Sequence, residues 1–144
     1  MDPTVKQQLI DAALGVRLRA HAPYSEFGVG AAVLTEGGRT FTGCNVENAS
    51  YGMTICAERA AVCAAVAGST PGARPTIVAV AVATKGGHSP CGACRQVLAE
   101  FQPADGEPPM EVVMIDSENP ALVRVMTLAA LLPEQFDARG LADS

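Results

Sequence analysis

Charged residues are scarce in this sequence, and no stretch of it is rich in lysine or arginine. Only 17% of the 144 residues are charged, and the formal net charge is −5. Proteins that bind polynucleotides need clustered basic side chains for phosphate contacts, so we expect a small neutral substrate and no nucleic-acid partner. Low charge with 49% hydrophobic residues also indicates apolar surface buried between subunits. The alternative is an alanine-rich soluble domain.

The sequence also lacks a long apolar run and an export signal. No segment approaches the roughly 18 consecutive apolar residues of a membrane span, so we expect no membrane partner. Met1-Asp2-Pro3 offers neither the basic nor the apolar region of a signal peptide. We therefore expect the five cysteines to be reduced thiols in the cytoplasm, available to metal. The length suits a single domain, residues 1–144.

Three cysteines and one glutamate in two short motifs indicate a metal site. Cys-Ala-Glu-Arg occupies residues 56–59, and Pro-Cys-Gly-Ala-Cys occupies residues 90–94. A catalytic zinc site uses three protein ligands and leaves the fourth position for water. Cys91 and Cys94 would share one face of a helix that starts near Cys91, where the helix dipole favours thiolates. We predict that these two residues and Cys56 bind zinc and that Glu58 contacts its water.

Two other interpretations of the C-x-x-C pair stay open. A redox pair is expected near a thioredoxin-like pattern, and it leaves Cys56 and Glu58 without a role. A structural zinc site needs four closed ligands. Cys63 lies about two helical turns, roughly 10 Å, beyond Cys56, and Cys44 would need a special loop. His88 is then the candidate fourth ligand, although its place before the second motif favours a loop residue.

Three further segments accompany the two cysteine motifs. They are Pro23-Tyr24-Ser25-x-Phe27-x-Val29-Gly30-Ala31-Ala32, Gly43-x-Asn45-Val46-Glu47-Asn48-Ala49-Ser50-Tyr51-Gly52 and Leu131-Leu132-Pro133-x-x-Phe136. Together the five segments are distributed along most of the chain, between residues 23 and 136, and resemble the zinc-dependent nucleoside deaminases. With cysteine as the first ligand, the pattern is similar to the small, homotetrameric cytidine deaminases. The resemblance implies a hydrolase of pyrimidine salvage, with one zinc ion per subunit, that converts cytidine and deoxycytidine to uridine and deoxyuridine plus ammonia.

The same resemblance implies roles for residues around the metal. Glu58 would carry protons between water and the base, as in zinc base deaminases. Phe27 would pack against the pyrimidine, and Asn45 and Glu47 would hold the ribose, with Glu47 on the 3′-hydroxyl. The remaining implied contacts are Ala57, Tyr51 and Phe136, the last two from regions that reach across a subunit boundary. From the residues alone, Phe27 could be a core phenylalanine, and Asn45 and Glu47 could belong to an Asx-turn loop.

Three thiolates would leave a zinc site with a net negative formal charge. We hypothesise that Arg59 offsets it by a hydrogen bond to a ligand sulfur. Arg95 is the competing candidate, and a solvated helix arginine is the simpler alternative. We interpret His21 as structural and Cys63 as an inert buried thiol.

Other functions compete with nucleoside deamination. A blasticidin-type antibiotic deaminase shares the zinc core, but such proteins resemble this one less at Glu47 and Arg59. A modified nucleoside is a further substrate class. An RNA- or DNA-editing role is disfavoured by the acidic balance, and a structural zinc module would give Glu58 no task.

Hydrophobic periodicity predicts a three-layer α/β/α sandwich with a five-stranded mixed sheet. The expected helices span residues 3 to about 20, 56–67, 91–101 and 128–132. The expected strands span residues 27–35, 39–46, 76–84, 111–115 and 122–126, followed by an extended tail from Pro133. We expect the last two strands to pair antiparallel, and the second and third helices to lie side by side with their N-termini at the zinc.

Overall fold

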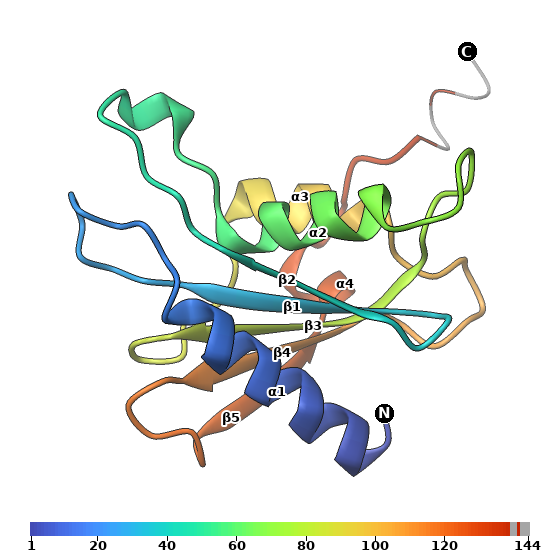
Figure 1. The fold of residues 1–144 in the computed structure, drawn as a ribbon. Helices are drawn as coiled ribbons and strands as arrows, with labels where there is room; N and C mark the ends of the chain where they lie inside the picture. Colours follow the sequence, from blue (N-terminus) through green and yellow to red (C-terminus); the bar gives the residue numbers. More distant parts are fainter. Residues whose placement is uncertain (139–140, 142–144) are drawn as a thin grey trace.

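A mixed five-stranded sheet forms the centre of the structure, a computed structural model that describes residues 1–138 and 141 (Figure 1). The strand order is β2-β1-β3-β4-β5; β3 and β4 are parallel and the other neighbours are antiparallel. The strands are β1 (Gly30–Thr35), β2 (Thr40–Cys44), β3 (Ile77–Thr84), β4 (Glu111–Asp116) and β5 (Val123–Thr127). This topology, including the antiparallel last pair, confirms the predicted sheet.

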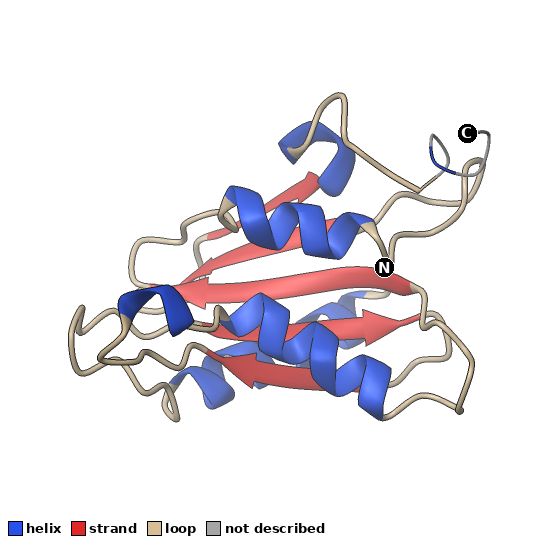
Figure 2. Cartoon of the chain, turned by 90° about the horizontal axis from the view of Figure 1, so that it is seen from above, coloured by secondary structure: helices blue, strands red, loops and turns tan. Residues whose placement is uncertain are grey.

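Helices cover both faces of the sheet. Helix α1 (Pro3–Arg17) packs on one face, and α2 (Ala57–Ala67), α3 (Gly92–Ala99) and the short α4 (Leu128–Leu131) pack on the other. Figure 2 shows the same strands and helices from a second direction. A single 3₁₀ turn, η1 (Tyr51–Met53), lies between β2 and α2. The arrangement is the α/β/α sandwich that the sequence predicts.

Strand β3 is the central element, and its alternating side chains build two different cores. Val80 and Val82 face α2 and α3, whereas Ala79, Ala81 and Ala83 face α1. All of these residues are buried. The strand is therefore covered on both faces, as its near-continuous apolar sequence predicts.

Two glycines allow the helices to approach the sheet closely. A Cβ at Gly43 on β2 would collide with the main chain of α2 at Ala57 and Ala61, and a Cβ at Gly30 would collide with α1. Side chains larger than hydrogen are excluded there because the helix backbones already occupy the space. Close packing of α2 on β2 fixes where α2 begins, and so where Cys56 lies.

Some element boundaries and one burial state differ from the predictions. The first helix ends at Arg17, and β1 begins at Gly30 rather than residue 27. The side chain of Asn45 explains the late start. Its Oδ1 accepts from Val29 N and its Nδ2 donates to Phe27 O, both at 2.8 Å, so main-chain pairing of Asn45 with Val29 is reduced to Asn45 N donating to Val29 O. Cys63 was predicted to be buried, but it is exposed. The sheet-facing stripe of α2 consists instead of Ala57, Ala61, Val62 and Ala65.

The C-terminal segment has no regular secondary structure in its described part up to Ala138. From Pro133 to Ala138 the chain contains no helix or strand, as expected for a tail, and residues 139–140 and 142–144 lie outside the described part. Within the described residues, every helix is too short or too polar to cross a membrane.

Candidate active site

The N-termini of α2 and α3 meet at the cluster of three cysteines. Cys56 is the N-cap residue of α2, Cys91 is the N-cap residue of α3, and Cys94 lies in the first turn of α3. Their sulfur atoms all lie within 4.8 Å of one another. Helices α2 and α3 pack against each other, so side-by-side packing brings two distant sequence motifs to one point, as predicted.

The donor set of this cluster fits a zinc ion. Zinc–sulfur bonds of about 2.3 Å in tetrahedral geometry need sulfurs roughly 3.8 Å apart, within the observed spread. Burial and the nearby charges of Glu58 and Cys56 raise the pKa of the Cys94 thiol. Burial opposes ionisation of Cys91 too, but hydrogen bonds from Cys94, Cys56 and Ala93 outweigh it and lower the pKa of that thiol. Full ionisation of three adjoining thiols therefore needs a cation between them, and soft thiolates suit zinc. Among the described residues this is the cluster that could hold a metal; Cys44, Cys63 and His88 are not part of it.

Glu58 adjoins the cysteine cluster on the first turn of α2. Its side chain is 5% exposed, and the Cys94 thiol lies 3.5 Å from Oε2. Burial raises the pKa of this carboxyl above its ordinary value. A carboxyl group with a raised pKa holds a proton more readily than an exposed one, which suits a group that must accept and then donate protons in general acid–base catalysis.

Two arginines near the cluster have different partners. Arg59 Nη2 lies 3.6 Å from Cys56 Sγ and donates to Thr54 O at 3.2 Å. Hydrogen bonding to Cys56 raises the pKa of the Arg59 guanidinium. Arg95 instead donates to Pro90 O, Leu131 O and Ser89 Oγ. The structure thus places Arg59 beside a candidate ligand, whereas the Arg95 side chain ties α3 to the loop before Cys91 and to the end of α4.

A cavity of about 210 Å³ opens beside the cluster. Its walls include Phe27, Asn45, Ala57, Glu58, His88 and Cys91. Glu58 and Ala57 are buried, whereas Phe27 is 38% exposed, so the cavity runs from the cysteines outward past Phe27. Phe27 and Asn45 are neighbours through the Asn45 Nδ2 to Phe27 O hydrogen bond. Phe27 is therefore a wall of this cavity and not a residue of the central core.

The other residues predicted to contact substrate lie outside the cavity of their own chain. Glu47 accepts hydrogen bonds from Tyr24 N and from the Ser25 main chain and hydroxyl. The Ser25 hydroxyl is the main cause that holds the pKa of Glu47 below its ordinary value. Tyr51 is 73% exposed with its ring 5.5 Å from that of Tyr24, and Phe136 is 67% exposed.

His88 is a cavity residue that the sequence patterns did not indicate. The ring of His88 lines the cavity and lies 6.0 Å from the ring of Phe27. Its position three residues before Cys91 was the available signal. His21 has a structural setting, because its main chain pairs with Asn45 and Glu47.

Comparisons with known proteins agree with this geometry. Residues 3–106 match the model of the cytidine and deoxycytidylate deaminase zinc-binding region. The chain is 42% identical over 140 residues to a cytidine deaminase of Halalkalibacterium halodurans, which covers 96% of this chain and 98% of that protein. A cytidine deaminase of Mycobacterium tuberculosis is 46% identical over 121 residues, 81% of this chain and 78% of that protein. The crystal structure of a cytidine deaminase from Burkholderia pseudomallei superimposes with a TM-score of 0.77 at 46% identity, covering 94% of this chain and all of that one.

Proposed function

This chain belongs to the cytidine and deoxycytidylate deaminase family, and we infer that it is a zinc-dependent hydrolase that deaminates cytidine and deoxycytidine. The products are uridine or deoxyuridine and ammonia. One observation carries the inference: three thiols and a buried glutamate converge at the inner end of a cavity sized for one ring. Each of the four side chains has a task in this reaction.

The residues of the chain divide the chemistry between them. Cys56, Cys91 and Cys94 would hold one zinc ion, which supplies the Lewis acidity that brings the pKa of water toward neutrality. Glu58 takes a proton from the attacking water and delivers it to N3 of the base; it then takes the remaining proton of the hydroxyl added to C4 and passes it to the amine, which leaves as ammonia. Its burial beside the thiols supports this shuttle, because burial raises the pKa of the carboxyl and so helps it to keep the proton that it takes from water.

Substrate recognition follows from the cavity wall. Phe27 packs against the pyrimidine ring and Ala57 provides main-chain contact at its inner end. The side-chain amide of Asn45 already hydrogen-bonds to the main chain of Phe27 and Val29. We therefore assign Asn45 to shaping the cavity wall and to orienting the ribose of the substrate. Glu47 uses three acceptor positions within its own chain. A carboxylate has about four such positions, and the remaining one is assigned to the 3′-hydroxyl of the sugar.

An absorbance assay with zinc analysis tests the proposed function. Purified protein is mixed with cytidine or deoxycytidine, and the loss of cytosine absorbance is followed beside zinc content per chain. We expect turnover of both nucleosides with about one zinc per chain. Full zinc without turnover would redirect the search to modified cytosines and antibiotics. A zinc-free, inactive protein would overturn the assignment.

Arg59 is proposed to offset the negative charge of the three thiolates. Replacing Arg59 with alanine removes the contact to Cys56 and should lower kcat or zinc affinity about tenfold or more, the usual effect of losing a partner of a metal ligand. Folding should persist, because Arg59 is partly exposed. Arg74→Ala, which breaks a pair with Glu100 at the exposed surface, is the matched control. Wild-type turnover and zinc affinity in Arg59→Ala would refute the role.

We also propose a cytoplasmic homotetramer in which Phe136 and the loop that holds Tyr51 complete a neighbouring subunit's site. Their exposure and their place outside the cavity support the assembly, and the reduced thiols that a zinc site needs support the compartment.

Mixed subunits test this composite site. Phe136→Ala should raise KM roughly tenfold through loss of an aromatic contact. Assemblies that mix Phe136→Ala with Glu58→Gln subunits should regain activity, because a site can then combine intact Glu58 with intact Phe136 from the neighbour. If Phe136 served its own chain, mixing would restore nothing. Sedimentation before and after mixing measures whether subunits exchange.

A further inference from the structure

The loop between β3 and α3 forms one side of the cavity mouth through His88. The His88 ring lies 6.0 Å from the Phe27 ring, with an interplanar angle of 58°. Both side chains line the cavity, and both are exposed, whereas Glu58 at its inner end is 5% exposed. At this spacing the two rings form an aromatic pair, so they are adjoining parts of the wall that a flat ligand passes on its way to Glu58.

The volume of the cavity indicates which part of a nucleoside lies at this mouth. Its roughly 210 Å³ is below the range of about 300–1,000 Å³ that is typical of pockets for drug-sized ligands. The cavity holds one ring, so the atoms that join the base to the sugar lie at the mouth. Side chains there affect how tightly the nucleoside is held more than how its inner edge reacts.

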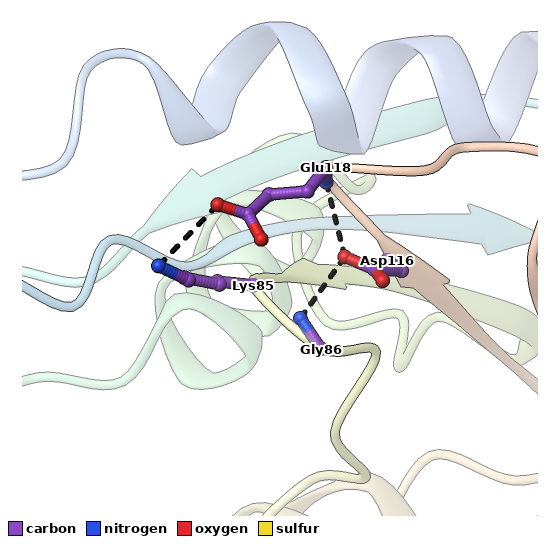
Figure 3. A network of polar contacts seen from close by, with 4 residues as sticks. All are labelled: Lys85, Gly86, Asp116 and Glu118. Atoms are coloured by element: carbon purple, nitrogen blue, oxygen red, sulfur yellow. Dashed lines mark hydrogen bonds and ion pairs between the residues drawn. The ribbon is translucent and has the colours of Figure 1, made fainter.

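The carboxylate of Asp116, the last residue of β4, holds the loop in place. Asp116 Oδ1 accepts hydrogen bonds from Gly86 N and Glu118 N, both at 3.0 Å (Figure 3). The hydrogen bond from Gly86 is the main cause that holds the pKa of Asp116 below its ordinary value. The carboxylate is therefore ionised at neutral pH and accepts strongly. In the same network, the exposed side chains of Lys85 and Glu118 form an ion pair at 3.3 Å.

Contacts of the residues on both sides of Gly86 connect the Asp116 hydrogen bond to the position of His88. The main-chain N–H of His88 donates to Thr84 Oγ1 at 2.7 Å. Gly86 and Gly87 have φ values of +90° and +66°, a region that glycine adopts without steric cost. A Cβ at Gly86 would lie 3.0 Å from His88 Nε2, so the imidazole folds directly over the residue that Asp116 binds.

We propose that His88 contacts the bound nucleoside at the cavity mouth beside Phe27, and that Asp116 is a positioning residue that fixes His88 there. The proposal rests on the proposed function for its substrate. It assigns His88 to affinity and not to the chemical step, since Glu58 and the thiols occupy the inner end. An interaction made equally in the ground and transition states changes KM and leaves kcat unchanged.

Substitutions of His88 distinguish a contact made by the face of its ring from one made by its nitrogen atoms. His88→Ala should raise KM for cytidine roughly three- to tenfold, the size of one aromatic contact, with kcat within about twofold of wild type. His88→Phe should restore KM if the ring face makes the contact. Equilibrium binding of uridine, measured by calorimetry, should weaken by the same factor in His88→Ala. Unchanged KM and uridine affinity in His88→Ala, or a loss in kcat alone, would overturn the contact.

A double-substitution cycle tests whether Asp116 acts through His88. Asp116→Ala should raise KM and weaken uridine binding as His88→Ala does, and the double variant should be no worse than His88→Ala alone. Glu118→Ala is the matched control. It removes the ion pair with Lys85 but keeps the main-chain N–H that donates a hydrogen bond to Asp116, so KM should not change. Asp116→Asn keeps Oδ1 but loses its charge, so the hydrogen bonds from Gly86 N and Glu118 N should weaken. If Asp116→Ala does not fold, the cycle uses Asp116→Asn, whose smaller rise in KM should disappear in the His88→Ala background. Multiplicative effects of the two substitutions would overturn the positioning role.

The same measurements distinguish this proposal from the proposed function. If the wild-type protein binds uridine but turns over neither nucleoside, the deaminase assignment fails, and the uridine affinities of the variants still test His88 and Asp116. If the wild type is active and the variants match it in KM and uridine affinity, the failure belongs to His88 alone.

Discussion

Replacing Glu58 with glutamine is expected to lower kcat by roughly a thousandfold, within the 10²–10⁴ range of general acid–base catalysis. The amide has the same shape but cannot carry protons from water to N3 and on to the leaving amine. Zinc content should not change, because the three thiols are untouched. Glu100→Gln, at an exposed glutamate on the opposite end of α3, is the control and should keep wild-type kcat.

Stability separates loss of chemistry from loss of fold in this variant. Burial raises the pKa of Glu58 in the folded state. Ionisation of Glu58 therefore lowers the free energy of unfolding as the pH rises above the pKa that Glu58 has in the unfolded chain. The neutral amide escapes that cost, and metal-free Glu58→Gln should unfold at the same temperature as the metal-free wild type or higher near pH 7. The raised pKa also predicts that, as the pH is lowered, wild-type kcat/KM begins to fall at a pH above the usual range of glutamate pKa values. A variant that keeps more than a tenth of wild-type kcat would exclude Glu58 as the proton carrier.

The cysteine cluster could be predicted from sequence because it depends on local rules. Cys56 and Cys91 each precede an alanine- or glycine-led helical segment, and both are N-caps in the structure. Cys91 and Cys94 share one helical turn, so their proximity follows from helix geometry. Only the meeting of α2 with α3 is a long-range feature, and the predicted β-α-β order supplied it.

Residues placed by distant contacts were harder to predict. Asn45, directly after β2, delays the start of β1 because its side chain hydrogen-bonds to the main chain of Val29 and Phe27, and periodicity carries no information on such a bond. His88 became a cavity residue through a loop tied to Asp116, 30 residues from Gly86. Cys63 was assigned to the core from its place in an apolar helix, yet neighbouring positions face the sheet. Tyr51 and Phe136 lie outside their own chain's cavity, so their predicted roles depend on a second subunit.

Replacing Cys94 with alanine is expected to abolish activity and zinc binding together. Cys94 is the fully buried member of the cluster, and its sulfur lies beside both Glu58 and the other thiols. Two remaining cysteines cannot supply the three protein ligands of a catalytic site. We expect zinc to fall to under about a tenth of an ion per chain and kcat to fall below detection, more than a thousandfold. Metal analysis and the nucleoside assay measure both.

Comparison with the metal-free wild type shows whether the loss is due to the metal or to packing. Zinc bound to the folded state adds stability that the unfolded chain lacks, so chelation should lower the melting temperature of the wild type. Cys94→Ala should melt near the chelated wild type and show no response to added zinc, because the small cavity left by the thiol is a minor loss. Cys63→Ala, which removes an exposed cysteine outside the cluster, should keep both the zinc and the response to chelation. If zinc binding survived Cys94→Ala but not Cys63→Ala, the metal would lie outside the cluster of Cys56, Cys91 and Cys94. Glu58 would then not adjoin the metal, and its proposed role would be refuted.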